Sequence, residues 1–249
     1  MKELCTGCEC ERIEQMIRHA VWSSQKEKVV IGLSGGIDSA VASVLASRAI
    51  GADNVMGYFL PSSVTPKGDI EDVDELCRNF CINYSVVPIT KILGEYEKLP
   101  GFKETAYLKG NLMARIRMAT LYYYANLNNA LVCGTSNKSE YLLGYCTKHG
   151  DSAADIQPVL HLYKQDIYRI AEEIKIPSSI IKKAPSAGLY PGQSDEKEIG
   201  FSYNDIDTAL INLEKNGWQP SDETEEKILE KVKSASHKRN SPPSLLKTG

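Results

Sequence analysis

Long apolar runs are missing from this sequence. No run of about 18 apolar residues exists, so we expect no segment that spans a membrane. Charged residues interrupt the first apolar stretch, which excludes an ordinary signal peptide. An excess of charge of one sign is missing too. The formal net charge is −3, which gives no overall reason to expect a nucleic-acid or acidic-membrane partner. We therefore expect a cytoplasmic protein with neither kind of partner.

The composition is that of an ordinary globular protein. Hydrophobic residues make up 42% and charged residues 24% of the 249 residues, which is enough to bury a sizeable core without disulfides or metals. We predict a flexible tail over residues 1–10. Residues 11–249 are predicted to form a single domain, with an extended C-terminal tail from Ser241-Pro242-Pro243 onward.

The cysteines of the predicted tail form a C-x-x-C-x-C cluster, Cys5, Cys8 and Cys10. Three thiolates could hold zinc, but a structural zinc site uses four ligands and no fourth is evident. We expect reduced cysteines without a function, and metal analysis with and without residues 1–10 would decide between the two interpretations.

Apolar strand-like runs alternate with segments of helical spacing. We predict strands at residues 29–33, 55–60, 84–87 and 130–133, and helices at 11–22, 38–50, 69–80, 105–126, 139–143 and 164–174. Residues 184–200 are rich in Pro, Gly, Ser and Asp and read as a long loop. Alternation of this kind predicts an α/β fold with a doubly wound parallel sheet flanked by helices. In such a sheet, ligands bind beyond the carboxyl ends of the strands.

A glycine turn, Ser34-Gly35-Gly36-Ile37-Asp38-Ser39, lies between the first predicted strand and the next helix. Adjacent glycines let a polyphosphate approach backbone N–H groups, and a helix start favours anions. Asp38 would repel phosphate unless a cation lay between them, which suggests Mg²⁺. The segment lacks the lysine of a Walker A loop and the spacing of G-x-G-x-x-G. Two glycines alone would indicate only a strand-to-helix turn; the whole string favours pyrophosphate binding.

This string resembles the loop of the ATP pyrophosphatase superfamily, which cleaves ATP between its α- and β-phosphates. Further segments narrow the resemblance to ammonia-dependent NAD synthetases over residues 10–243, with a Rossmann-like fold of the adenine nucleotide alpha-hydrolase type. They are Gly134-Thr135-Ser136-Asn137-Lys138-Ser139-Glu140, Leu143-Gly144-Tyr145-Cys146-Thr147-Lys148-His149-Gly150-Asp151, Ala154-Asp155, Leu162-Tyr163-Lys164, Pro185-Ser186-Ala187-Gly188-Leu189, Gln193-Ser194-Asp195-Glu196 and His237-Lys238-Arg239. Each segment is weakly specific, but the ordered series is highly specific.

The resemblance implies a role for each matching residue. ATP would contact Gly32, Leu33, Ser34, Gly35, Gly36, Ile37, Asp38, Ser39, Thr135, Lys164 and Ser186. Mg²⁺ would be held by Asp38 and Glu140, and the substrate deamido-NAD by Arg117, Lys148, Asp155, His237 and Lys238.

Local readings compete with several of these roles. From its position alone, Glu140 would be interpreted as an exposed glutamate on a helix. Lys164 would be interpreted as a solvated lysine at a helix start, and residues 237–239 as a basic surface patch. Arg115 and Arg117 lie two apart on a predicted helix, so both cannot face one ligand, and the resemblance favours Arg117.

The implied reaction has two steps. The nicotinate carboxylate of deamido-NAD attacks ATP to give an acyl adenylate and pyrophosphate, and ammonia then forms the amide of NAD and releases AMP. No covalent nucleophile on the protein is needed, so catalysis would rest on positioning and charge neutralisation. The resemblance also implies a homodimer, with the helix at 105–126 at the interface.

Other functions remain open at this point. A glutaminase domain would need about 250 more residues, so free ammonia is the expected nitrogen donor unless a separate subunit supplies it. The early cysteines would suit a tRNA-thiolating ATP pyrophosphatase, although the charge and the absence of an RNA-binding appendage argue against it. A nucleotide-binding module without catalysis is disfavoured because both proposed metal carboxylates are present.

Overall fold

The structure, a computed structural model, describes residues 4–186, 188–190, 192–243 and 245. One parallel sheet lies at its centre, with strand order β3-β2-β1-β4. The strands are β1 (Lys28–Leu33), β2 (Val55–Phe59), β3 (Asn83–Val86) and β4 (Ala130–Cys133). The chain order turns back between β1 and β4, which makes the gap beyond these two strands the switch point where ligands bind in such sheets.

The strands form where β-branched and other apolar residues are concentrated. Along β1, Val29 and Ile31 pack into one apolar cluster and Val30 into another, because successive side chains point to opposite faces. Both faces are therefore buried, as expected for a parallel sheet.

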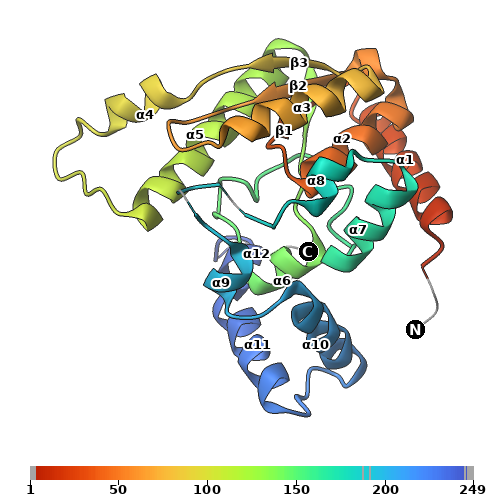
Figure 1. The fold of residues 1–249 in the computed structure, drawn as a ribbon, viewed down its shortest axis with the longest axis vertical. Coiled ribbons are helices and arrows are strands. Elements are labelled where there is room, and N and C mark those ends of the chain that lie inside the picture. Colours follow the sequence, from red (N-terminus) through yellow and green to blue (C-terminus); the bar gives the residue numbers. More distant parts are fainter. Residues whose placement is uncertain (1–3, 187, 191, 244, 246–249) are drawn as a thin grey trace.

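Helices cover both faces of the sheet (Figure 1). The elements beside one face are α1 (Thr6–Ser23), α2 (Ile37–Ile50), α3 (Lys67–Phe80), α7 (Lys164–Glu173) and α8 (Ser178–Lys182), with a short 3-10 helix at Ala52–Asn54. On the other face lie α4 (Thr90–Tyr96) and α5 (Ala106–Leu127). The doubly wound α/β fold predicted from the sequence is confirmed. Across the described residues, none of the helices combines the length and apolar character needed to span a membrane.

A second, smaller apolar cluster holds the C-terminal helices together. It joins α6 (Lys138–Leu143) to α9 (Asp195–Ile199), α10 (Tyr203–Lys215) and α11 (Glu223–Ser234). The pair α10 and α11 lies side by side at the bottom of Figure 1, followed by α12 (Ser236–Arg239). The loop predicted over 184–200 is wrong for its last part, because α9 begins at Asp195.

The N-terminal segment differs from its prediction. Helix α1 begins at Thr6, and Cys10 is buried in the main core. Cys5 and Cys8 are joined by a disulfide. The flexible tail predicted over residues 1–10 is therefore wrong from Thr6 onward, and the reduced state is wrong for Cys5 and Cys8. Residues 1–3 lie outside the described residues.

The C-terminal tail is described only in part. Residues 241–243 belong to no helix or strand, and Leu245 is fully exposed. Residues 244 and 246–249, which the prediction of an extended tail also covers, lie outside the described residues.

Candidate active site

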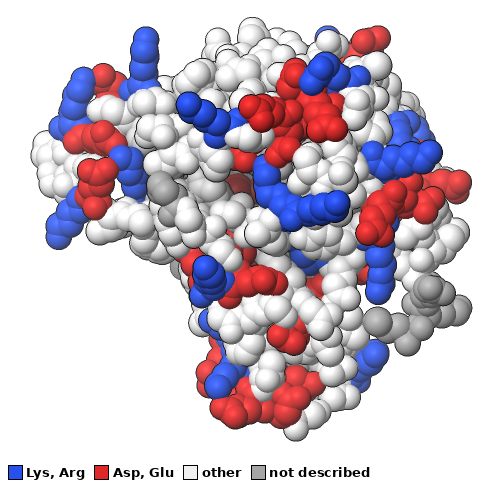
Figure 2. All heavy atoms as spheres, viewed as in Figure 1, with Lys and Arg blue, Asp and Glu red and all other residues white. Residues whose placement is uncertain are grey.

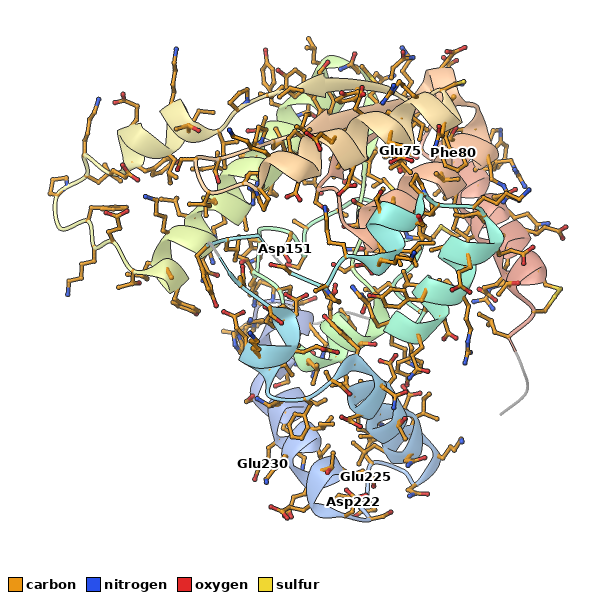
Figure 3. All side chains as sticks on the ribbon, in the orientation of Figure 1. Glu75, Phe80, Asp151, Asp222, Glu225 and Glu230 are labelled. Atoms are coloured by element: carbon orange, nitrogen blue, oxygen red, sulfur yellow. A yellow bond between two sulfur atoms is a disulfide. The ribbon has the colours of Figure 1, made fainter. Side chains whose placement is uncertain are left out.

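A cavity of about 860 Å³ opens beyond the carboxyl ends of β1, β2 and β4. Every residue assigned to ATP from the sequence lines it: Gly32, Leu33, Ser34, Gly35, Gly36, Ile37, Asp38, Ser39, Thr135, Lys164 and Ser186. Glu140 lines it too, as does Asp151, which Figure 3 labels near the centre of the molecule. The topology thus gathers segments that lie far apart along the chain, from Gly32 to Lys238.

The glycine loop is ordered by its own hydroxyl groups. The Oγ atoms of Ser34 and Ser39 lie 3.1 Å apart, and Gly36 N donates to Ser34 Oγ at 3.2 Å. Gly35 has a φ of +75°, in the left-handed region that favours glycine. Helix α2 begins directly after Gly36 and has no side-chain cap, so its first N–H groups face the cavity end of the helix, where an anion is favoured.

Two carboxylates from different strand ends converge on one buried lysine. Lys164 Nζ donates to Asp38 Oδ2 at 2.5 Å and to Glu140 Oε1 at 3.2 Å. The lysine side chain is only 2% exposed, and burial of a charge is tolerated when it is paired and hydrogen-bonded. Asp38 and Glu140 therefore lie close enough to share one cation.

Burial governs the protonation of this group. It raises the pKa of Glu140 to about 7, helped by the negative charges of Asp38 and Asp195 and opposed by Lys164. For Lys164, burial works in the opposite direction, but Asp38 and Glu140 outweigh it and raise the pKa of the ammonium group. Lys164 therefore stays charged near neutral pH, while Glu140 ionises with difficulty.

Hydrogen bonds of two buried side chains hold the carboxylates and the lysine in place. Asn137 caps α6 by accepting from Glu140 N at 3.0 Å, and its Nδ2 donates to Asp38 Oδ1 at 2.8 Å. Ser139 Oγ accepts from Lys164 N at 3.0 Å and donates to Asp207 of α10. One short segment after β4 thus positions all three charged groups.

Sequence reasoning assigned no role to Asn137 or Asp207. An asparagine just before a helix is a typical N-cap, so the cap on α6 could have been found. The bond from Asn137 to Asp38 could not, because it joins segments that only the fold brings together.

The residues predicted for deamido-NAD divide into two groups. Arg117 and Lys238 line the cavity. Arg117 Nε donates to Leu60 O at 3.0 Å, and burial lowers the pKa of its guanidinium. Lys238 Nζ donates to Gly144 O and Cys146 O, each at 2.7 Å.

The other members of this set, Lys148, Asp155 and His237, do not line the cavity. Lys148 Nζ donates to His237 O at 2.5 Å, and Asp155 Oδ2 accepts from Val132 N at 2.7 Å. Asp155 also accepts from Tyr122 of α5 at 3.3 Å. Asp155 and Lys148 therefore contact α5, where Arg115 is exposed and donates to Lys148 O.

A polar network that was not assigned from the sequence borders the carboxylates. Tyr203 OH donates to Glu140 Oε1 at 3.3 Å and to Asp195 Oδ2 at 3.4 Å, and its ring lies 5.0 Å from Lys164 Nζ. Tyr145 OH donates to Asp195 Oδ1 at 3.0 Å. The C-terminal helices therefore close one side of the site with hydroxyl groups.

The carboxylates of Asp38 and Glu140 are suitable ligands for a magnesium ion that also binds phosphate oxygens. Mg²⁺ prefers carboxylate, phosphate and water oxygens, and Asp38 and Glu140 already converge on a cationic nitrogen. Among the described residues, no cluster of three or more Asp, Glu, His or Cys side chains could hold a metal by itself. The two carboxylates would therefore hold the ion together with phosphate oxygens and water.

Charges of both signs are mixed over the face drawn in Figure 2. The red group at the bottom of this view lies over the start of α11, whose first turn holds the exposed Glu223 and Glu226. No continuous basic surface is visible on this face, so it does not resemble a nucleic-acid groove.

A parallel sheet with a glycine loop and paired carboxylates at its switch point defines a nucleotide-binding α/β protein. Comparison with known proteins goes further: the pattern of the NAD synthase family matches residues 9–242. The chain is 54% identical over 240 residues to an NH(3)-dependent NAD(+) synthetase of Methanoregula boonei, covering 96% of this chain and 97% of the relative. It is 44% identical to the enzyme of the same name from Thermoplasma volcanium, over 95% of this chain and 96% of that one.

Solved structures agree with this similarity. An NMN synthetase from Francisella tularensis matches with a TM-score of 0.89 and 34% identity, over 97% of this chain and 99% of that one. An NH3-dependent NAD synthetase from Campylobacter jejuni matches with a TM-score of 0.85 and 34% identity, over 98% of this chain and 100% of that one. The chain belongs to the NAD synthase family, whose members are ligases, and this decides against the tRNA-thiolating alternative.

Proposed function

We propose that this protein uses ATP and ammonia to convert deamido-NAD into NAD, with AMP and pyrophosphate as the other products. The observation that carries the proposal is the convergence of Asp38 and Glu140 on Lys164, inside a cavity lined by every residue expected to contact ATP. Family membership supplies the reaction class.

The first step joins the substrate to AMP. The nicotinate carboxylate attacks the α-phosphorus of ATP, the bond from that phosphorus to the bridging oxygen breaks, and pyrophosphate leaves. The glycine loop and the start of α2 would bind phosphate oxygens through backbone N–H groups. Lys164 would neutralise charge that develops on the leaving pyrophosphate.

A magnesium ion held by Asp38 and Glu140 would offset the negative charge of the phosphates when ATP is bound. This assignment rests on the chemistry of the two carboxylates and on their shared cationic partner. Burial raises the pKa of Glu140 to about 7 in the free protein. A bound magnesium ion would lower this pKa, so that Glu140 would be ionised at neutral pH and below.

In the second step, ammonia displaces AMP from the acyl adenylate. Ammonia attacks the activated carbonyl carbon, a proton leaves the nitrogen, and the carbonyl–oxygen bond to AMP breaks, which gives the amide. None of this requires a bond to the protein. The described residues near Glu140, including Tyr145 and Tyr203, would shield the adenylate from water.

The position of the remaining substrate residues supports a homodimer. Asp155 and Lys148 contact α5, which leaves Tyr123 and Leu127 exposed by 63% and 65%. Large exposed apolar side chains on one helix are typical of an interface. We propose that deamido-NAD extends from the cavity along Arg117 toward this helix and its counterpart in a second copy. The cytoplasmic location expected from the sequence stays a prediction.

The test is product analysis. Incubation with ATP, Mg²⁺, ammonium and deamido-NAD should give NAD and AMP in equal amounts, while glutamine in place of ammonium should give little. No AMP at all would contradict the proposal and favour a binding module without catalysis, and AMP without NAD would contradict amidation of deamido-NAD. Hydroxylamine should trap the acyl adenylate as a hydroxamate.

The Francisella structure motivates a second substrate. That protein is named an NMN synthetase, and its likeness to this chain raises the question of whether deamido-NMN is also amidated. A parallel assay with deamido-NMN decides between deamido-NAD and deamido-NMN as the substrate. A higher kcat/KM for deamido-NMN would make the mononucleotide the substrate.

A further inference from the structure

Lys183 makes a set of contacts that the reaction described above does not use. This lysine follows α8, and its Nζ donates to Gly35 O at 3.1 Å and to Asp69 Oδ1 at 2.9 Å. It also forms an ion pair with Asp72. A single ammonium group therefore joins the glycine loop to the first turns of α3, and all three of its donor positions can be used.

The glycine loop and α3 are in close contact at this point. A Cβ atom built on Gly35 would lie 2.9 Å from Asp69 O and 3.1 Å from Asp69 Cα. Together with its positive φ of +75°, this leaves room for no side chain at Gly35. The carbonyl of Gly35 accepts from Lys183 Nζ, and Gly35 itself lines the cavity.

Lys183 also begins the segment that carries Ser186. Both residues line the cavity, and Asp195 N donates to Pro185 O at 3.1 Å, which ties the far end of the segment back to its start. A shift of Lys183 would therefore be transmitted in two directions, to the glycine loop and to the loop around Ser186.

Burial does not remove the charge of this lysine. Burial opposes ionisation, but the hydrogen bonds from Lys183 to Asp72 and Asp69 outweigh it and raise the pKa of the ammonium group. The contact with Gly35 is thus made by a permanent cation, and hydrogen bonds to charged groups are stronger than neutral ones.

We propose that Lys183 is a positioning residue for ATP: it holds the Gly35 carbonyl, and so the phosphate-binding amides of the glycine loop, in register with the loop that carries Ser186. This role rests on the proposed function, because it assumes that the cavity takes ATP. Lys183 is not assigned a contact with the reacting atoms.

The test compares Lys183→Met with Lys182→Met, the matched control at the adjacent exposed lysine. Binding of α,β-methylene-ATP is measured by calorimetry, and the KM values for ATP and deamido-NAD by steady-state kinetics. Lys183→Met should raise Kd and KM for ATP about tenfold, leave the KM for deamido-NAD within about twofold of the wild-type value, and be partly rescued by Lys183→Arg. Lys182→Met should change none of these constants.

A triple variant separates positioning from simple electrostatics. Lys183→Met leaves Asp69 and Asp72 without their cation, which alone would destabilise the fold. In Lys183→Met/Asp69→Asn/Asp72→Asn this repulsion is gone, so the melting temperature should recover while ATP binding stays weak.

Two results would overturn the role of Lys183: unchanged ATP binding in Lys183→Met, or recovery of both stability and ATP binding in the triple variant. If Lys183→Met does not fold, ATP binding by Lys183→Arg and by the triple variant is compared with that of the wild type instead. Wild-type protein that binds no ATP analogue would overturn the proposed function itself, and the role of Lys183 with it.

Discussion

Replacing Glu140 by Gln should make the free protein more stable while it removes activity. The Glu140 side chain is 18% exposed, and burial, with Asp38 and Asp195, raises its pKa from 4.5 to about 7 against the opposing charge of Lys164. The difference between 4.5 and 7 corresponds to about 3 kcal/mol, since a tenfold change is about 1.4 kcal/mol. The attraction of Lys164 is already contained in this value.

Proton linkage determines whether the free energy of unfolding rises or falls with pH. Between pH 4.5 and 7 the folded protein keeps a proton on Glu140 that the unfolded chain has lost, so the free energy of unfolding falls as the pH rises through this window. Glu140→Gln has no proton to lose. Its advantage over the wild type should be absent below pH 4.5 and complete above pH 7, where it amounts to roughly 6–12 °C in melting temperature.

The assay is thermal unfolding at pH 4.5 and pH 8 without nucleotide or metal, together with NAD formation at pH 8. We expect turnover to fall roughly a hundredfold or more, because a charge that acts on the phosphates is lost. A variant no more stable than the wild type at pH 8 would refute the argument from burial. A stable variant with normal turnover would refute the functional role.

Glu198→Gln is a control of opposite sign. Burial of Glu198 opposes ionisation, but hydrogen bonds from Tyr145, Tyr190 and Gln193 outweigh it and lower the pKa of the carboxyl group. Its ionised form therefore stabilises the fold above the ordinary glutamate pKa, and this contribution is lost as the pH falls. Glu198→Gln should lower the melting temperature at pH 8, where Glu140→Gln raises it.

Three further changes test other parts of the site. Asp38→Ala should reduce pyrophosphate release at least roughly a hundredfold with an unchanged circular dichroism spectrum, and near-normal turnover would remove Asp38 from the proposed metal site. Arg117→Met should raise the KM for deamido-NAD about tenfold or more and leave that for ATP unchanged, whereas the exposed Arg115→Met should behave as wild type in steady-state kinetics; equal effects would contradict the choice of Arg117. Tyr123→Glu should convert a homodimer into monomers in sedimentation, and a wild type that is already monomeric would exclude the α5 interface.

Most of the sheet could be predicted from local patterns. The predicted strands at 29–33, 55–60, 84–87 and 130–133 lie within one residue of the observed bounds, because short β-branched runs between turn residues identify buried strands well. Helix α10 was not predicted, although Ile206, Leu210 and Leu213 repeat at helical spacing and form its buried face.

The N-terminal error has a physical reason. The C-x-x-C-x-C spacing of Cys5, Cys8 and Cys10 is typical of metal binding, whereas the first turn of α1 includes Gly7, which favours a helix weakly. In the structure Cys5 is the N-cap and Cys10 packs against the core near Ile13, where a free cysteine acts as a small apolar side chain. Spacing alone does not distinguish such a cysteine from a ligand.

The arrangement of the site depended on topology. The sequence places Asp38 after β1 and Glu140 after β4, but only the order β3-β2-β1-β4 makes these strands neighbours. The contacts of Lys183 with Gly35 and Asp69 likewise join three segments far apart in the chain. Propensity and periodicity act over a few residues, so they carry no information about such pairs.

Lys164 shows how a local rule fails where function is concentrated. A lysine at a helix start is usually solvated, yet this one is 2% exposed. Two carboxylates, Asp38 and Glu140, face one ammonium group, so the group retains an excess negative charge that a buried site tolerates poorly. Burial raises the pKa of Glu140 to about 7, and the negative charges of Asp38 and Asp195 add to this shift. A second cation that arrives with ATP would offset the charge of both carboxylates, so Asp38 and Glu140 favour binding of metal and nucleotide together.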